Sequence, residues 1–467
     1  MSAKGRNDQL QRLMHEAGFT SHKSLARAVV EESALVSGPF QRCDHTDVAR
    51  WISGMTPRGN KPAIIAAAIG RRLGRKVTVA EIGMASSAVV LEPHLGLAYP
   101  DAIEAGTDSI TALWHADLSE ATQIVGAKVD TNAWSTSSLR WLVSGNNQQR
   151  LDTVSAPRVG PSDIHRFKET VKLFAELDNR FGGGHGRKAL IQYLATDGER
   201  LLRGRFTDAI GKTLYAAIAE ATLLAAWMSY DSAPGSGLAQ RYFIQALALA
   251  DTSRDRRLGA TILDAMSHQA TFVGRYRDAA NLAMAARTGT AGIATPTQTA
   301  HFHSMEARAL ARLGDAKACS SAIAEAIKIF DRRDINNDPE WIQYFDAAEL
   351  SAEISHCFRD LGRPVDAAEH ATRCLTMIDT TTSPRSRFFA YMVLADAYLN
   401  AGEVEQAYET VAKALNIGEQ LRSARCVNYV HEFRTLAKSM GAHSGASEFE
   451  EHAREYRIWR LTSAVQR

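Results

Sequence analysis

The stretch YMVLADAYLNAGEVEQAYETVAKAL, from Tyr391 to Leu415, decides the predicted fold. Apolar residues lead into a Gly-Glu turn signal at Gly402, and small or apolar residues follow that glycine five, nine and twelve positions later. Those offsets fall on one face of an α-helix, where small side chains let two helices approach closely. The stretch therefore predicts two packed helices joined by a tight turn.

The same template fits the chain five times, with a turn residue at Pro234, Gly274, Gly314, Gly362 and Gly402. The residues five, nine and twelve positions after these anchors are small or apolar in every copy. They are Ala239, Ala279, Cys319, Ala367 and Ala407; Phe243, Ala283, Ile323, Ala371 and Val411; and Ala246, Ala286, Ala326, Cys374 and Ala414. A helix pair that recurs every 40 or 48 residues predicts stacked helical hairpins.

The helix before each anchor shows an apolar face as well. Positions four and eight residues before the anchors are apolar in four copies, and Glu306 breaks the pattern in the remaining one. Two helices with a Gly-Asp or Gly-Glu turn, as at Gly314 and Gly402, resemble the tetratricopeptide repeat. The resemblance implies an all-α fold with a right-handed helical-repeat solenoid. A generic all-helical bundle is the alternative.

The repeats also set the predicted domain boundaries. A polar stretch from Asn147 to Pro161 is typical of a linker, and the amphipathic C-terminal helices suit the polar cap that a solenoid needs. We expect an N-terminal domain in residues 1–85, a connector subdomain and linker in 86–160, the first solenoid helices in 161–233, five repeats in 234–420 and capping helices in 421–467.

Composition excludes several classes of protein. With 45% hydrophobic and 23% charged residues, the chain of 467 residues has the make-up of a soluble globular protein. No apolar run approaches the roughly 18 residues of a membrane span, and no apolar signal segment opens the chain. The five cysteines form no C-x-x-C pair, which argues against a disulfide or zinc framework. We expect a cytoplasmic protein without a membrane contact.

Motifs for catalysis are also missing. Glu353 and His356 have the E-x-x-H spacing of a carboxylate-bridged metal site, but no second such motif exists to complete it. His301 and His303 are two residues apart, so they diverge on a helix. No G-x-S-x-G or Rossmann glycine pattern occurs. The sequence predicts neither an enzyme nor a metal or other cofactor.

Basic charge is concentrated at the N-terminus. Residues 1–85 hold 13 Lys and Arg against 7 Asp and Glu, whereas the rest of the chain is slightly acidic. Apolar spacing predicts five short helices in this segment, the third from about Asp44 to Ile52 and the fifth from about Val79. The positive charge favours an anionic partner for this domain.

Two motifs of this domain, SLARAV on the second helix and TDVARWISGMTPR on the third and its exit, resemble the helix-turn-helix of bacterial Xre or Cro-like repressors. The connection between these helices is longer here than in that family. The resemblance implies that the third helix enters the major groove of double-stranded DNA. Candidates for base contacts are Arg42, His45, Thr46 and Arg50. Candidates for phosphate contacts are Lys23, Arg27, Arg58 and Lys61. A merely solvated charged surface is the alternative.

In a solenoid of this type the first helix of each pair lines a concave groove. Positions two, six, ten and thirteen residues before the anchors give Asp264, His268, His301, Ser304, Arg308, Arg312, Glu349, Ala352, His356, Asp360, Met392, Asp396 and Asn400. Such a mixture of acids, histidines, arginines and amides suits an extended peptide, a polar small molecule or a partner protein. A solvated polar face is the alternative.

The segment DNRFGGGHGRKALIQYL, from Asp178 to Leu194, is the most unusual in the chain. Glycines before a helix can present backbone N–H groups to an anion, with His185 and Arg187 adding to the site. The P-loop spacing is absent because Lys188 is followed by Ala189. A flexible inter-helix turn or hinge is the alternative to a ligand site.

Five segments resemble the actinobacterial repeat regulators of the NsdA type: DNRFGGGHGR, GLAQRYFIQALALA, MSHQA, WIQYFDAAEL and HCFRDLGR. That resemblance implies a transcriptional regulator, often a repressor, associated with differentiation and antibiotic production. We expect a homodimer in which an effector bound by the repeats alters the spacing of two DNA-binding domains. The alternative is a protein–protein adaptor whose N-terminal domain is a docking module.

Overall fold

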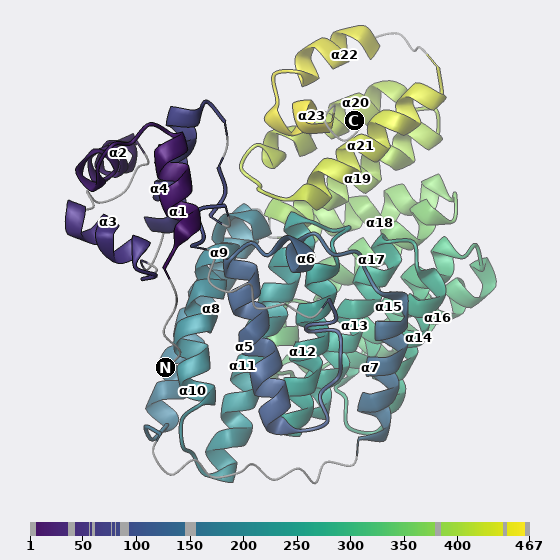
Figure 1. Cartoon of the computed structure of the whole chain (residues 1–467). Coiled ribbons are helices and arrows are strands. Elements are labelled where there is room, and N and C mark those ends of the chain that lie inside the picture. Colours follow the sequence, from purple (N-terminus) through teal and green to yellow (C-terminus); the bar gives the residue numbers. More distant parts are fainter. Residues whose placement is uncertain are drawn as a thin grey trace. The chain divides into compact units, whose positions relative to one another are not determined.

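In the computed structural model the chain divides into two compact units, the head (Met1–Leu91) and the body (Glu92–Arg467), which we describe separately (Figure 1). The structure describes residues 6–35, 43–55, 57, 61–75, 77–79, 81–84, 93–144, 156–378, 384–441 and 446–462. Within these ranges both units are helical and no β-strand is assigned. The predicted boundary after residue 85 and most of the predicted linker lie outside them.

Four helices lie in the described residues of the head. They are α1 (Asp8–Glu16), α2 (His22–Leu35), α3 (His45–Ile52) and α4 (Lys61–Leu73). Asp44 caps α3 by accepting the backbone N–H groups of Thr46 and Asp47 at 2.8 and 3.1 Å, and the Asp47 side chain accepts the N–H of Asp44 in return. The fifth helix predicted from about Val79 is wrong for the residues described there, which form turns.

The body begins with helices that precede the repeats. They are α5 (Ile103–Leu118), α6 (Thr122–Val125), α7 (Thr131–Val143), α8 (Pro161–Phe181), α9 (Gly183–Tyr193), the π-helical turn η1 (Leu194–Gly198) and α10 (Glu199–Leu202).

Five helix pairs follow, joined by the predicted turns. They are α11 (Asp208–Ser232) with α12 (Gly237–Ser253), α13 (Arg256–Phe272) with α14 (Tyr276–Gly289), α15 (Pro296–Arg312) with α16 (Ala316–Phe330), α17 (Ala347–Asp360) with α18 (Pro364–Met377), and α19 (Pro384–Asn400) with α20 (Val404–Gly418). Two 3-10 turns, η2 (Ile335–Asn337) and η3 (Glu340–Ile342), lie before α17, and α21 (Ala424–Ser439), α22 (Ala446–Ala453) and α23 (Arg457–Thr462) end the described chain.

The turn residues and the small-residue faces are confirmed. Gly274, Gly314, Gly362 and Gly402 all have φ between +68° and +85°, a conformation that glycine adopts without the steric cost of a side chain. Every residue at the three template offsets is buried, with Ile323 the most exposed at 7%. The apolar periodicity therefore located both the helix pairs and their contact faces.

Glu306, which breaks the apolar pattern, has an ionic environment in the structure. Its Oε2 lies 3.3 Å from Nη2 of Arg287 on α14 and 3.7 Å from Nδ1 of His303. The carboxylate thus joins α15 to the preceding pair by charge where the other copies use apolar contact.

The first helices of the five pairs, together with α21, form a closed ring in the body. In order, α11 contacts α13, α13 contacts α15, α15 contacts α17, α17 contacts α19 and α19 contacts α21, while α21 contacts α11. The early helix α8 also contacts α19. Segments that are distant in the sequence thus meet, and the inner faces of these helices point toward a shared interior.

The segment from Asp178 to Arg187 takes part in this closure. The N–H of Gly184 donates to the carbonyl of Arg422 at 2.9 Å, and the N–H of Arg422 donates to the carbonyl of Phe181 at 2.7 Å. Arg385, at the start of α19, lies 2.9 Å from Asp178 and 3.5 Å from Asp231. We call these contacts between the two ends of the helix stack the clasp.

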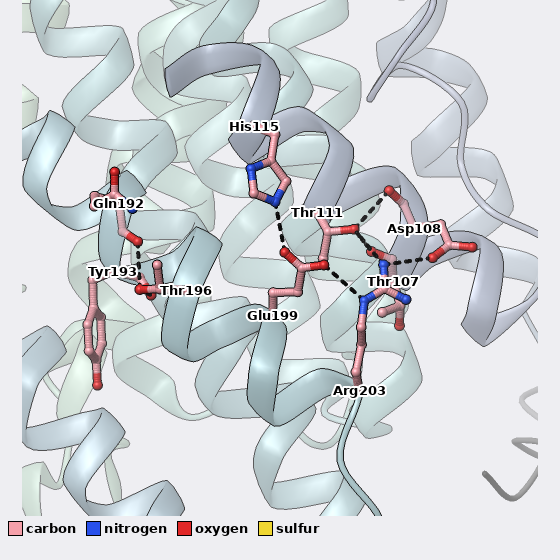
Figure 2. A network of polar contacts seen from close by, with 9 residues as sticks. All are labelled: Thr107, Asp108, Thr111, His115, Gln192, Tyr193, Thr196, Glu199 and Arg203. Carbon is pink, nitrogen blue, oxygen red and sulfur yellow. Dashed lines mark hydrogen bonds and ion pairs between the residues drawn. The ribbon is translucent and has the colours of Figure 1, made fainter. Parts of the chain in front are cut away.

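A polar network holds α5 against α10 beside the π-helical turn, as Figure 2 shows. Glu199 accepts from Arg203 at 2.9 Å and lies 2.8 Å from Nε2 of His115, and Arg203 also contacts Asp108 at 3.2 Å. Burial alone would raise the pKa of Glu199, but the hydrogen bonds from His115 and Arg203 outweigh burial and lower it. The network is solvated, so it positions α5 more than it stabilises the fold.

One helix in the described residues, α11, has the length and apolar composition of a membrane span. Most of it is buried among other helices of the body, as in the core helix of a soluble protein.

Candidate functional site

The third head helix, α3, presents one polar face. His45, Thr46, Ala49 and Arg50 are exposed on it. The opposite side holds Val48, Trp51 and Ile52, all buried in the head core. Because the apolar residues anchor the helix in the core, its exposed face has a fixed orientation in the head. Ala49 was missed by sequence reasoning, and its small side chain would let the helix backbone approach a surface closely.

The head residues predicted to contact DNA lie on α3, on the neighbouring helices α2 and α4, or outside the described residues. His45 and Arg50 are exposed, and Arg50 is only weakly held, 4.0 Å from Asp47. The hydroxyl of Thr46 is hydrogen-bonded to Asp44, which lowers the pKa of that carboxyl.

On neighbouring helices Lys23 and Arg27 are exposed, four residues apart on α2, and Lys61 is partly exposed at the start of α4. Arg42 and Arg58 lie outside the described residues.

The predicted groove residues lie inside the ring, and most of them are buried. Less than one tenth of the surface is exposed in Asp264, His301, Ser304, Arg308, Ala352, His356, Met392 and Asp396. Asn400, at the end of α19, is exposed and donates to the backbone carbonyl of Asp396. The polar positions are therefore brought together, but in an enclosed interior rather than along an open groove.

Ion pairs between neighbouring inner helices compensate most of these charges. Asp264 lies 2.5 Å from Nδ1 of His301, and Arg308 lies 2.5 Å from Glu353. Burial opposes protonation of His301, but the carboxylate of Asp264 raises the pKa of the imidazole. Each such pair ties one inner helix to the next.

A second ionic cluster follows on α17 and α19. Asp360 lies 2.8 Å from Arg359 and 3.4 Å from Arg312, and Arg359 is 3.7 Å from Asp396. Burial nevertheless raises the pKa of Asp396 to about 7.

Three residues near these ion pairs keep exposed surface. Tyr344, whose hydroxyl lies 3.3 Å from Nε2 of His301, has 54% of its surface exposed. The protein around it still raises the pKa of its hydroxyl well above the usual value. His268 and Glu349 also retain partial exposure, and burial raises the pKa of Glu349 to about 7. These side chains are surrounded by protein and still keep accessible surface.

An aromatic group closes one part of this interior. The hydroxyl of Tyr230 is hydrogen-bonded to Nδ1 of His268 at 3.1 Å. The ring centroids of Phe389 and Tyr429 lie 4.8 Å apart. The guanidinium of Arg425 lies over both Tyr230 and Phe389, at 4.7 and 4.8 Å from the ring centroids. Sequence reasoning missed Arg425 and Tyr429 because α21 follows the last anchor, so the template assigned it no inner face.

The predicted site at His185 and Arg187 is occupied by contacts within the body. Arg187 lies 2.6 Å from the buried carboxylate of Asp117, which also accepts from the hydroxyl of Tyr242 at 2.7 Å. The imidazole of His185 lies against the ring of Phe181, with centroids 4.9 Å apart. These contacts give the segment a role in packing, and a ligand site there stays a prediction.

Comparison with known families gives one match. The sequence profile of a family described as the SP15 N-terminal domain matches residues 10–85, which run from α1 to the turns after α4. No curated protein matches the chain. The match concerns the head alone, so both the helix-turn-helix assignment and the resemblance to NsdA-type regulators stay predictions.

Proposed function

We propose that the protein is a DNA-binding transcriptional regulator, acting as a repressor, in which the head binds double-stranded DNA and the body receives an effector. The observation that carries the proposal is the exposed face of α3, where His45, Thr46 and Arg50 stand opposite a fully buried apolar side. Exposed Lys23 and Arg27 on α2 supply the phosphate contacts that such docking needs.

The body supports the effector half of the proposal. Its inner helices gather acids, histidines and arginines from segments more than a hundred residues apart, and most of these side chains are buried. Polar groups buried in this way are costly to a scaffold that needs only apolar contact. A peptide, a small molecule or a segment of a partner protein is the proposed occupant. The resemblance to NsdA-type regulators implies that the process under control is differentiation or secondary metabolism.

The effector acts by shifting an equilibrium between two states of a homodimer. A ligand with different affinity for the two states changes the spacing of the two heads and therefore the affinity for a paired operator site. Linkage requires that operator DNA change effector affinity by the same factor.

Selection of duplexes from a random library with the full-length protein tests the DNA-binding half. We expect an enriched sequence, whose retardation weakens steeply as salt rises because phosphate contacts release counterions. Arg50→Ala should lower affinity for that sequence about 10- to 100-fold and relax preference at one base, the loss typical of an arginine that reads guanine. Arg12→Ala, an equal loss of charge on the exposed side of α1, is the matched control.

Wild-type affinity and sequence preference in the Arg50→Ala protein would contradict the assignment of α3 as the reading helix. An unenriched library, together with a protein partner that co-purifies in fixed ratio, would instead support the adaptor alternative.

A further inference from the structure

Arg425, near the start of α21, is a buried arginine that makes no ion pair with the described residues. Only 9% of the residue is exposed, and its Nε has no hydrogen-bond partner. Its guanidinium is held between the rings of Tyr230 and Phe389, at 4.7 and 4.8 Å, and makes no ion pair in the described part of the body. A stacked guanidinium keeps its N–H donors at the edge, free to meet a planar acceptor.

The other cations of the interior are already matched. Arg308 is paired with Glu353, and Arg359 with Asp360, at 2.5 and 2.8 Å. The buried Asp231 is shared by Arg385 and the hydroxyl of Ser423. Among these arginines of the described body, Arg425 alone has no carboxylate within ion-pair distance. Because an unpaired charge in a protein interior is costly, its retention indicates an anionic partner that the chain itself does not provide.

The histidines near Arg425 are also exposed to the charge of several arginines. Burial, followed by Arg425 and Arg308, holds the pKa of His268 well below its usual value, and burial with Arg308 and Arg359 does the same for His356. Nδ1 of His356 is buried without a hydrogen-bond partner. The surroundings of Arg425 are thus a positive region with a second unmatched polar atom.

We propose that Arg425 binds the carboxylate of a small aromatic organic acid inside the ring of body helices. The guanidinium fork matches the two oxygens of a carboxylate, and one guanidinium balances the charge of a monoanion but not that of a phosphate dianion. Trp227, Tyr230, Phe389 and Tyr429 provide flat apolar walls for the rest of the ligand. The binding of the acid does not depend on the proposed function. Its role as the effector of the regulator does.

Calorimetric titration of the full-length protein with benzoate, benzamide and inorganic phosphate tests the site. We expect benzoate to bind and to raise the melting temperature, while benzamide, equal in shape but neutral, and phosphate bind at least about ten-fold more weakly, the contribution of charge-assisted hydrogen bonds. Equal binding of benzoate and benzamide, tighter binding of phosphate, or no binding of benzoate would each overturn the proposal.

Substitution of the arginine supplies the second test. Arg425→Gln should weaken benzoate at least about ten-fold without lowering the melting temperature of the ligand-free protein, because it removes a costly charge. Arg434→Gln is the matched control, since Arg434 also lies on α21 over an aromatic ring, that of Trp459, but is hydrogen-bonded to Thr462 at 3.1 Å. It should keep benzoate affinity. An equal loss of affinity in both variants would overturn the site.

Arg425→Lys keeps the experiment decisive if the glutamine variant does not fold. It retains the charge but not the fork, so benzoate should bind more weakly to a natively stable protein, and unchanged affinity would overturn bidentate binding. DNA retardation is measured separately in the presence of benzoate. Benzoate binding without DNA binding would remove the proposed function and leave this site, whereas DNA binding without benzoate binding would do the reverse.

Discussion

At the scale of single residues, Glu349 makes the stability of the body depend on pH. Burial raises its pKa to about 7, against a usual value of 4.5, and Glu353 and Asp346 add to the rise while Ser386 and His301 oppose it. Since the folded state holds the proton more tightly, the stabilisation is fully present below about pH 4.5 and is lost as the pH rises through 7.

Glu349→Gln keeps the size of the side chain and removes the charge. We therefore expect the variant to melt roughly 1 to 3 °C above the wild type at pH 8 and close to it at pH 4.5. Thermal unfolding at both pH values measures this. Glu409→Gln, on the exposed side of α20, is the control and should show no such difference. The same change in melting temperature at both pH values would contradict the assignment.

At the scale of helices, the sequence predicted the pairs well because their determinants are local. A glycine with positive φ ends the first helix of a pair, as at Gly402, and small buried residues such as Ala407 mark the contact face of the second. The repeat of these residues along the sequence therefore locates both helices of each pair. The exposed and buried faces of α3 follow for the same reason, since helical spacing separates Arg50 from Val48.

Ring closure could not be predicted in this way. It depends on a small rotation accumulated over all five pairs, and on contacts such as Arg385 to Asp178, which are 207 residues apart. Closure is also what turned an expected open groove into an enclosed interior. The sequence could not single out Arg425 for a related reason. The two rings that its guanidinium contacts, Tyr230 on α11 and Phe389 on α19, belong to the first and the last helix pair.

The turn between α8 and α9 shows why glycines stand in the unusual segment. A Cβ at Gly183 would lie 2.6 Å from the carbonyl oxygen of Met228 and 2.9 Å from Cβ of Asp231, and both neighbours are fixed by α11. Gly183→Ala should therefore destabilise the protein by about 1 to 3 kcal/mol, the usual cost of overpacking. Chemical denaturation measures the loss. Gly235→Ala, where a Cβ meets nothing within 4 Å, is the control. Equal stability of the two variants would contradict close packing at this turn.

At the scale of the whole body, the closed ring changes what an effector can do. An open solenoid alters its curvature by small adjustments at every pair, whereas a closed ring must first release the contacts that join its ends. The clasp, built on Arg385 with Asp178 and Asp231, is therefore the element whose two states an effector would have to distinguish. Any coupling between the interior and the head passes through its opening or through small shifts within a closed ring.

Arg385→Gln separates these two possibilities. It leaves the buried carboxylates of Asp178 and Asp231 without their cation, a change that typically costs 3 to 5 kcal/mol at about this degree of burial. We expect faster amide hydrogen exchange in α9 and at the start of α21, which meet at the clasp, and unchanged exchange in α15 on another part of the ring. Arg373→Gln, an exposed position on α18, is the control. Exchange that rises evenly through all the inner helices would show that the ring unfolds as one unit, and exchange that does not change at all would show that the charges of the clasp do not hold it closed.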